Sequence, residues 1–84
     1  MTEKRLLGQL KRKRAEALER VVHDHGDNLL ILAFTLVDDP DESFALVHDL
    51  LSSLWENGFD HATHPLHTYL YNELRLWADF WQSK

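Results

Sequence analysis

Six histidines are the residues of this chain whose type and spacing could do chemistry. His61, His64 and His67 recur at every third position, and His23 and His25 stand two apart. Neutral imidazole is a common metal ligand, so a three-histidine metal site is one interpretation. The other is an exposed polar loop, because this spacing, taken across a loop and a helix, does not bring the rings onto one face. We favour the loop, and we expect no metal and no cofactor.

Groups for covalent or acid–base catalysis are poorly arranged in the sequence. There is no cysteine, and Ser43, Ser52 and Ser53 lie in a helical pattern without the G-x-S-x-G turn that exposes a nucleophile. A glycine-rich phosphate loop is absent as well. The acids at 38–39 and 41–42 are typical of a helix N-terminus, where negative charge is stabilised by the helix dipole. We therefore expect a protein that is not an enzyme.

Charge is distributed unevenly along the chain. The net charge is −5, but residues 1–20 hold seven Lys and Arg against three Glu, a net charge of +4, and residues 21–84 carry −9. The run KRKR at 11–14 is the strongest basic signal. A solvated helix surface is one interpretation, and binding to nucleic acid or to an acidic protein is the other. The acidic remainder of the chain would repel phosphates.

The elements that must position these residues are helices, because apolar residues recur at three and four positions and no strand alternation occurs. We expect a first helix that Thr2 caps and that the segment HDHGD at 23–27 ends, with Gly26 as its C-cap. A second helix, capped by Asp27 or Asn28, continues to Leu36. The inner faces of these two helices are predicted to use Leu6, Leu7, Leu10, Ala17, Leu18, Val21, Val22, Leu29, Leu30, Leu32, Ala33 and Leu36.

The third and fourth helices have clearer boundary signals. Asp39 is a good N-cap, Pro40 suits the first helical position, and Asn57-Gly58 ends the third helix. The last helix begins near Pro65, after Thr63 or His64, and runs to the C-terminus. The predicted core positions on these two helices are Phe44, Val47, Leu50, Leu51, Leu54, Trp55, Leu66, Tyr69, Leu70, Leu74, Trp77, Phe80 and Trp81.

Together these patterns predict an all-α fold: a compact bundle of about four helices that occupies residues 1–84 as a single domain. No apolar run reaches the length of a membrane span, and the N-terminal segment lacks the apolar core of a signal peptide. We expect no membrane partner and a cytoplasmic location. If Tyr71, Phe80 or Trp81 is exposed, self-association is expected too.

The order of residues resembles region 2 of the sigma-70-family transcription initiation factors, especially those of the extracytoplasmic-function type. The family's apolar motifs correspond to segments 6–10, 17–22 and 29–33. Its long central motif corresponds to DDPDESFALVHDLLSSLW at 38–55, and its last loop and helix to the segment that runs from Phe59-Asp60 through Pro65-Leu66 to Tyr69-Leu70-Tyr71. The resemblance covers almost the whole chain.

The resemblance implies an all-helical domain with two binding surfaces. The family's central helix docks on the clamp helices of core RNA polymerase, which implies a polymerase-binding face of Asp41, Ala45, His48, Asp49 and Ser52. Its last loop and helix hold the unpaired bases of the −10 promoter element, which implies DNA-binding residues Phe59, His61, His67, Tyr71 and Arg75. Further partners implied by the resemblance are a region 4 protein or an anti-sigma factor.

Several residues depart from the family pattern. Phe44-Ala45 replaces an acidic pair, His48 replaces a glutamine, and Leu74-Arg75-Leu76 stands where the family has A-R-N. Residues 56–84 carry a net charge of −2, from four acids and two bases, although cations favour DNA binding. The alternative to a promoter-binding domain is therefore a sigma-like protein-interaction module, a mimic or regulator, that does not bind DNA.

Overall fold

The computed structural model describes residues 2–82, and within this range the chain forms four α-helices and no strand. They are α1 (Glu3–Lys11), α2 (Ala15–Val37), α3 (Pro40–Glu56) and α4 (Leu66–Gln82). The predicted all-α fold with four helices is confirmed. The last helix was expected to reach the C-terminus, but Ser83 and Lys84 lie outside the described residues.

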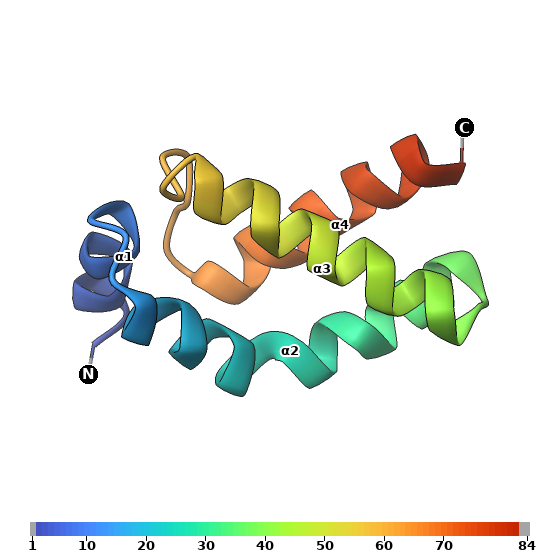
Figure 1. Ribbon diagram of the computed structural model, residues 1–84, viewed down its shortest axis with the longest axis horizontal. Helices are drawn as coiled ribbons and strands as arrows, with labels where there is room; N and C mark the ends of the chain where they lie inside the picture. The colour runs from blue at the N-terminus through green and yellow to red at the C-terminus, as the bar shows by residue number, and fades with distance from the viewer. Residues whose placement is uncertain (1, 83–84) are drawn as a thin grey trace.

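The three long helices lie side by side, and α1 crosses one end of them (Figure 1). The chain runs along α2, returns along α3, and passes through a loop into α4, which runs parallel to α2. At the far end Gln82 Nε2 donates a hydrogen bond of 2.6 Å to the carbonyl oxygen of Leu36, which ties the end of α4 to the end of α2. The result is a rod of 34 × 20 × 20 Å.

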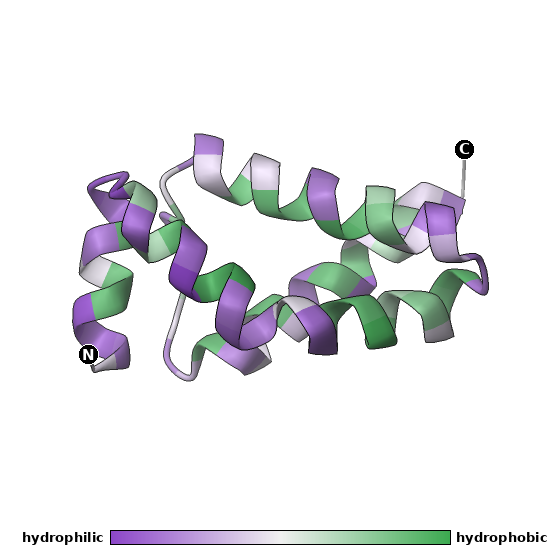
Figure 2. Ribbon diagram, turned by 60° about the horizontal axis from the view of Figure 1, so that its bottom comes forward, coloured by the Kyte–Doolittle hydropathy of each residue, from purple (hydrophilic) through white to green (hydrophobic). Residues whose placement is uncertain are grey.

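Hydrophobic side chains from all four helices and the last loop form one core between them. Figure 2 shows hydrophobic and hydrophilic positions mixed along every helix, as expected of helices that bury one side. Each fully buried leucine contributes about 1.5–3 kcal/mol to stability relative to an exposed one, so this cluster holds the helices together. The buried apolar residues are Leu6, Leu10, Ala17, Val21, Leu29, Ala33, Leu46, Val47, Leu50, Leu54, Phe59, Ala62, Leu66, Leu70, Leu74 and Ala78.

The first helix break was predicted at the wrong place. The segment 23–27 lies inside α2, and the chain instead turns at 12–14. Gly26 costs a helix only about 1 kcal/mol. Buried residues on both sides of it, Val21 and Leu29 among them, pack on the same core, so a continuous helix buries more than a broken one would. Packing therefore outweighs the local glycine signal.

The turn that does end α1 is a Schellman motif, the hydrogen-bonded C-cap in which one residue is left-handed. The N–H of Lys13 donates to Leu10 O at 3.0 Å, and the N–H of Arg14 donates to Gln9 O at 3.0 Å. Lys13 takes the left-handed position with φ 57°. Glycine is usual there, and its absence is why the sequence pattern did not reveal this turn. The basic run 11–14 thus covers the last residue of α1 and the sharp elbow after it.

Both predicted ends of α3 are confirmed. Asp39 Oδ1 accepts a 2.9 Å hydrogen bond from the N–H of Glu42, and Pro40 is the first helical residue. At the other end Gly58 has φ 66°, its N–H donates to Trp55 O, and the N–H of Phe59 donates to Leu54 O. This is a second Schellman motif, here with the expected glycine.

The start of α4 is capped from a distant part of the chain. The sequence predicted a start near Pro65 and no particular cap, and in the structure Glu3 Oε1, on α1, accepts the hydrogen bond from the N–H of Leu66. The same oxygen lies 3.2 Å from His64 Nδ1. Because the first N–H groups of a helix have no partner within it, this carboxylate stabilises α4 and holds α1 against it.

Three predicted core residues are in fact at the surface: Val22, Phe44 and Phe80 are exposed, Phe44 to 68% and Phe80 to 76%. In α3 the inward stripe runs through Leu54, Leu50 and Leu46 to Ser43, so Phe44 lies one position beyond it. In α4 the stripe is Leu66, Leu70, Leu74 and Ala78, each one turn from the next, and Phe80 lies on its flank. In both helices the apolar residues cover a wider part of the helix surface than the bundle can bury.

Candidate functional site

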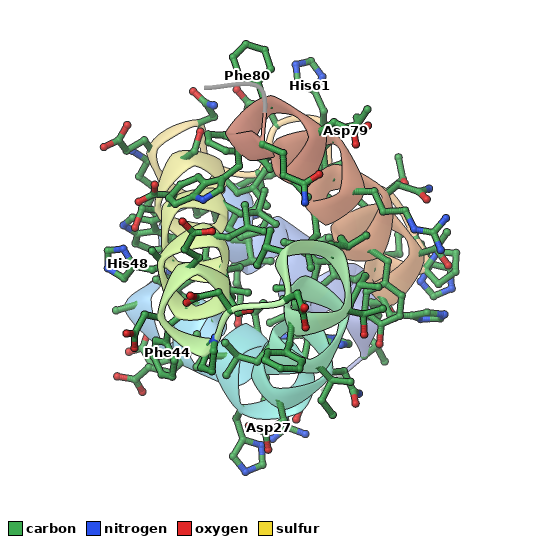
Figure 3. All side chains as sticks on the ribbon, turned by 90° about the vertical axis from the view of Figure 1, so that its right-hand side faces the viewer. Asp27, Phe44, His48, His61, Asp79 and Phe80 are labelled. Carbon is green, nitrogen blue, oxygen red and sulfur yellow. The ribbon has the colours of Figure 1, made fainter. Side chains whose placement is uncertain are left out.

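The five residues that the resemblance assigns to polymerase binding form one exposed face of α3. Asp41, Ala45, His48, Asp49 and Ser52 are all exposed, and they recur at three and four positions along the helix. Figure 3 shows Phe44 and His48 pointing outward on the same side of the bundle. The helix begins at a fixed residue because Asp39 caps it, so the direction of this face is set locally.

An apolar groove runs beside this face, between α2 and α3. One part of it is lined by Leu18, Val22, His48, Leu51, Ser52 and Trp55, so two residues of the predicted face also belong to the groove. A second hollow, near the turn between α2 and α3, includes Ile31, Phe34 and Phe44. Apolar surface rimmed by polar residues is typical of protein-binding sites. The α3 face and this groove together are called the α2–α3 surface below.

The residues assigned to DNA binding are separated by the fold. His67, Tyr71 and Arg75 follow one another by one turn on α4, and the rings of His67 and Tyr71 meet edge to face, 6.0 Å apart at 71°. His67 and Arg75 are exposed, and Tyr71 is partly buried against the core. His61 lies in the loop before α4 and points outward on a different side from His48 (Figure 3).

Phe59 was expected to contact bases, and the structure removes it from that surface. Its side chain is 0% exposed and is one of the largest fully buried side chains of the core. The Schellman motif explains the burial, because the residue after the left-handed position commonly packs back on the last turn of the helix. Leu54, the residue whose carbonyl accepts the N–H of Phe59, belongs to the same core cluster. An aromatic directly after a glycine C-cap was the sequence signal for a core position.

The histidines are not brought together as metal ligands. Among residues 2–82, no group of three or more His, Asp or Glu side chains is placed to hold a metal ion. Three histidines instead lie beside single carboxylates: His64 beside Glu3, His23 beside Asp24 at 3.1 Å, and His48 beside Asp49 at 3.9 Å. These are surface pairs, and they do not assemble a common site.

Within residues 2–82, two ionisable groups have a displaced pKa, and neither lies on the α3 face. The hydrogen bond from His23 holds the pKa of the Asp24 carboxyl below its ordinary value, and Arg20, with a 2.9 Å bond to the same side chain, acts in the same direction. Burial raises the pKa of the Tyr69 hydroxyl, and the negative charge of Glu73 adds to the effect. The groups around Asp24 lie on α2 and those around Tyr69 lie on α4.

Aromatic residues of α4 divide between the core and the surface. Tyr69, Trp77 and Trp81 are partly buried and pack on the core, as predicted. Phe80 and Leu76 are exposed and border a shallow apolar hollow on the α4 surface. The condition under which we expected self-association is therefore met at Phe80.

Comparison with known proteins supplies no relative for this arrangement. No protein-family model, no curated protein and no solved structure matches the chain. Among residues 2–82, no helix is both long enough and apolar enough to cross a membrane.

Proposed function

We propose that this protein is a sigma region 2-like module of the transcription machinery that binds the clamp helices of core RNA polymerase through the α2–α3 surface. The observation that carries the proposal is the arrangement of Asp41, Ala45, His48, Asp49 and Ser52 as one exposed, continuous face. The apolar groove beside it offers area to a partner helix, and helices commonly bind by laying an apolar face into such a groove.

Of the two forms of this proposal, the protein-interaction module without −10 element recognition by α4 is better supported. Phe59 is buried, and Arg75 is the one cation of α4. Counterion release from DNA rewards clustered cations, so a surface with a single arginine gains little from it. The fuller form, a transcription initiation domain that also holds the −10 element, needs His61, His67 and Tyr71 to bind bases with little electrostatic help.

Binding to purified core polymerase tests the proposal, with one substitution on α3 and one on α4. Ala45→Arg places a long cation on the α3 face, and the matched control Asn72→Arg does the same on the exposed side of α4. We expect Ala45→Arg to weaken binding about tenfold or more, a change of about 1.4 kcal/mol, and Asn72→Arg to change it less than about twofold. Failure of the unmodified protein to bind polymerase, or equal losses in both variants, would refute the proposal.

The −10 contact has its own test. A labelled single-stranded −10 oligonucleotide is titrated with the unmodified protein and with Tyr71→Ala and Arg75→Gln. The interaction-module form predicts that neither substitution changes affinity and that the −10 sequence binds no better than a scrambled one. A preference for the −10 sequence that Tyr71→Ala abolishes would instead establish the fuller form.

A further inference from the structure

The elbow between α1 and α2 concentrates positive charge at one end of the rod. Lys11, Arg12, Lys13 and Arg14 are all exposed there, and Lys13 is held in the left-handed conformation that turns the chain sharply. The turn also brings Arg5, on α1, to the same place as Arg12 and Arg14: the three arginines line one hollow together with Gly8, Gln9 and Glu16. Two cations of the run, Arg12 and Arg14, thus meet Arg5 in one hollow, although on a straight helix the run would point in all directions.

These cations lack acidic partners. In the part of the chain that the structure describes, no salt bridge involves Arg5, Lys11, Arg12, Lys13 or Arg14. The nearby acid Glu3 accepts the N–H of Leu66 and lies beside His64, so it is engaged at the start of α4. Glu16 is the one acid that lines the hollow. The elbow therefore keeps a positive potential although the whole chain is acidic.

The chemistry of the elbow favours phosphate groups over a protein surface. Protein interfaces depend on buried aromatic or aliphatic anchors, and the hollow is lined by arginine, glutamine, glutamate and glycine. Guanidinium groups form paired hydrogen bonds with phosphate oxygens, and clustered cations gain affinity by releasing the counterions of a nucleic acid. Gly8 adds no side chain to the hollow, and a methyl group built there would meet no atom within 4 Å.

The elbow also lies next to the loop that leads into α4. A Cβ added at Gly58 would lie 3.5 Å from the carbonyl oxygen of Lys11, and Glu3 joins α1 to His64. A strand held at the elbow would thus pass close to this loop. We propose that the arginine-lined hollow of the α1–α2 elbow binds the sugar-phosphate backbone of nucleic acid, independently of base sequence and of the α2–α3 surface.

Fluorescence anisotropy with a labelled oligothymidine tests this proposal without polymerase. The elbow variant Arg12→Gln/Arg14→Gln is compared with Arg20→Gln and Arg75→Gln, which remove arginines elsewhere. At about 50 mM salt we expect the elbow variant to bind about tenfold or more weakly, and its log–log salt slope to be shallower by about 1.4, since each phosphate contact on a single strand contributes roughly 0.7. Each control should change affinity less than about twofold.

A second variant, Arg5→Gln, removes the third arginine of the hollow and keeps the test decisive if the first one folds poorly by circular dichroism. Weaker binding in both elbow variants, with a helical spectrum in either one, supports the proposal. No binding of the unmodified protein at low salt, or equal losses in the Arg75→Gln control, would overturn it. Tighter binding of labelled polyglutamate than of the oligothymidine would assign the elbow to an acidic protein, and displacement of the oligonucleotide by inorganic phosphate at constant ionic strength would assign it to a small anion; either result rejects the proposal.

Discussion

Two turns of this molecule share one backbone motif and have opposite consequences. The α1–α2 elbow and the turn after α3 are both Schellman motifs, with Lys13 and Gly58 in the left-handed position. In the first, the following residue is Arg14, which stays exposed and lines the proposed phosphate-binding hollow. In the second, the following residue is Phe59, which is fully buried. The motif sets the path of the chain, and the next side chain decides whether that turn becomes surface or core.

The two surfaces that the resemblance implies also differ in whether their assigned residues are exposed. The α3 face keeps all its assigned residues on the outside, because one helix presents them at its own period. The DNA face was to combine two loop residues, Phe59 and His61, with α4, and of these Phe59 turned inward. Sites built on one regular element can be deduced from spacing, whereas sites shared with a loop depend on how that loop is packed.

Removing the buried ring at the second turn should have the largest effect. Phe59→Ala is expected to lower the free energy of unfolding by about 3–5 kcal/mol, the usual cost of deleting a core phenylalanine. Phe80→Ala is the matched control, because its ring is 76% exposed, and it should change stability by less than about 0.5 kcal/mol. Urea denaturation followed by circular dichroism measures both. A loss below about 1 kcal/mol for Phe59→Ala would mean that the ring is not a core anchor.

Exchanging residue types at Lys13 and Gly58, which hold the same place in the two motifs, tests the shared motif directly. Gly58→Ala should destabilise the protein by about 1–2 kcal/mol, because a side chain is strained at this φ. Steric clashes should add little, because the new Cβ would meet its neighbours only at ordinary contact distances. Lys13→Gly should stabilise it by about 1 kcal/mol by relieving the same strain. Thermal or urea unfolding provides the values. Changes of the same sign in both variants would contradict the proposed equivalence of the turns.

Helices α3 and α4 are capped differently, and a third experiment exploits this. Asp39 caps α3 from the adjacent position, whereas Glu3 caps α4 from another helix. Each change to alanine should cost about 1 kcal/mol, a typical value for a lost cap. Glu3→Ala should accelerate amide hydrogen exchange both at the start of α4 and in α1, while Asp39→Ala should do so at the start of α3 alone.

Asp39→Asn and Glu3→Gln are the conservative controls, because both keep an oxygen acceptor. They should restore most of the protection against exchange that the alanine variants lose. An unchanged exchange rate in α1 of the Glu3→Ala variant would show that this carboxylate does not join the two helices.

The smallest expected effect concerns acid. The pKa of Asp24 is lowered first by the hydrogen bond from His23 and then by Arg20, so the folded state favours the charged carboxylate. This contribution to stability is present above the pKa of the unfolded chain and is lost as the pH falls through the lower pKa of the folded state. The unfolding midpoint should therefore fall less steeply in acid for Asp24→Asn than for the unmodified protein. An equally steep fall of the midpoint in acid for the Asp24→Asn variant would contradict this contribution.

Local signals were enough to deduce much of this fold. The all-α class follows from the apolar period, and both ends of α3 follow from Asp39, Pro40 and Gly58, because caps and turns are decided within about four residues. The exposed α3 face follows from the same period. For these features the interacting groups are neighbours in the sequence, so residue order alone determines them.

Only the tertiary structure decided the remaining features. The chain breaks at Lys13 and continues through Gly26, because burying Val21 and Leu29 on one core outweighs a local glycine preference. Glu3 caps a helix 63 residues away, and Phe59 enters a core to which all four helices contribute. Each of these outcomes depends on free energy gained between segments that are distant in sequence. Residue order specifies these contacts only through the complete packing of the bundle.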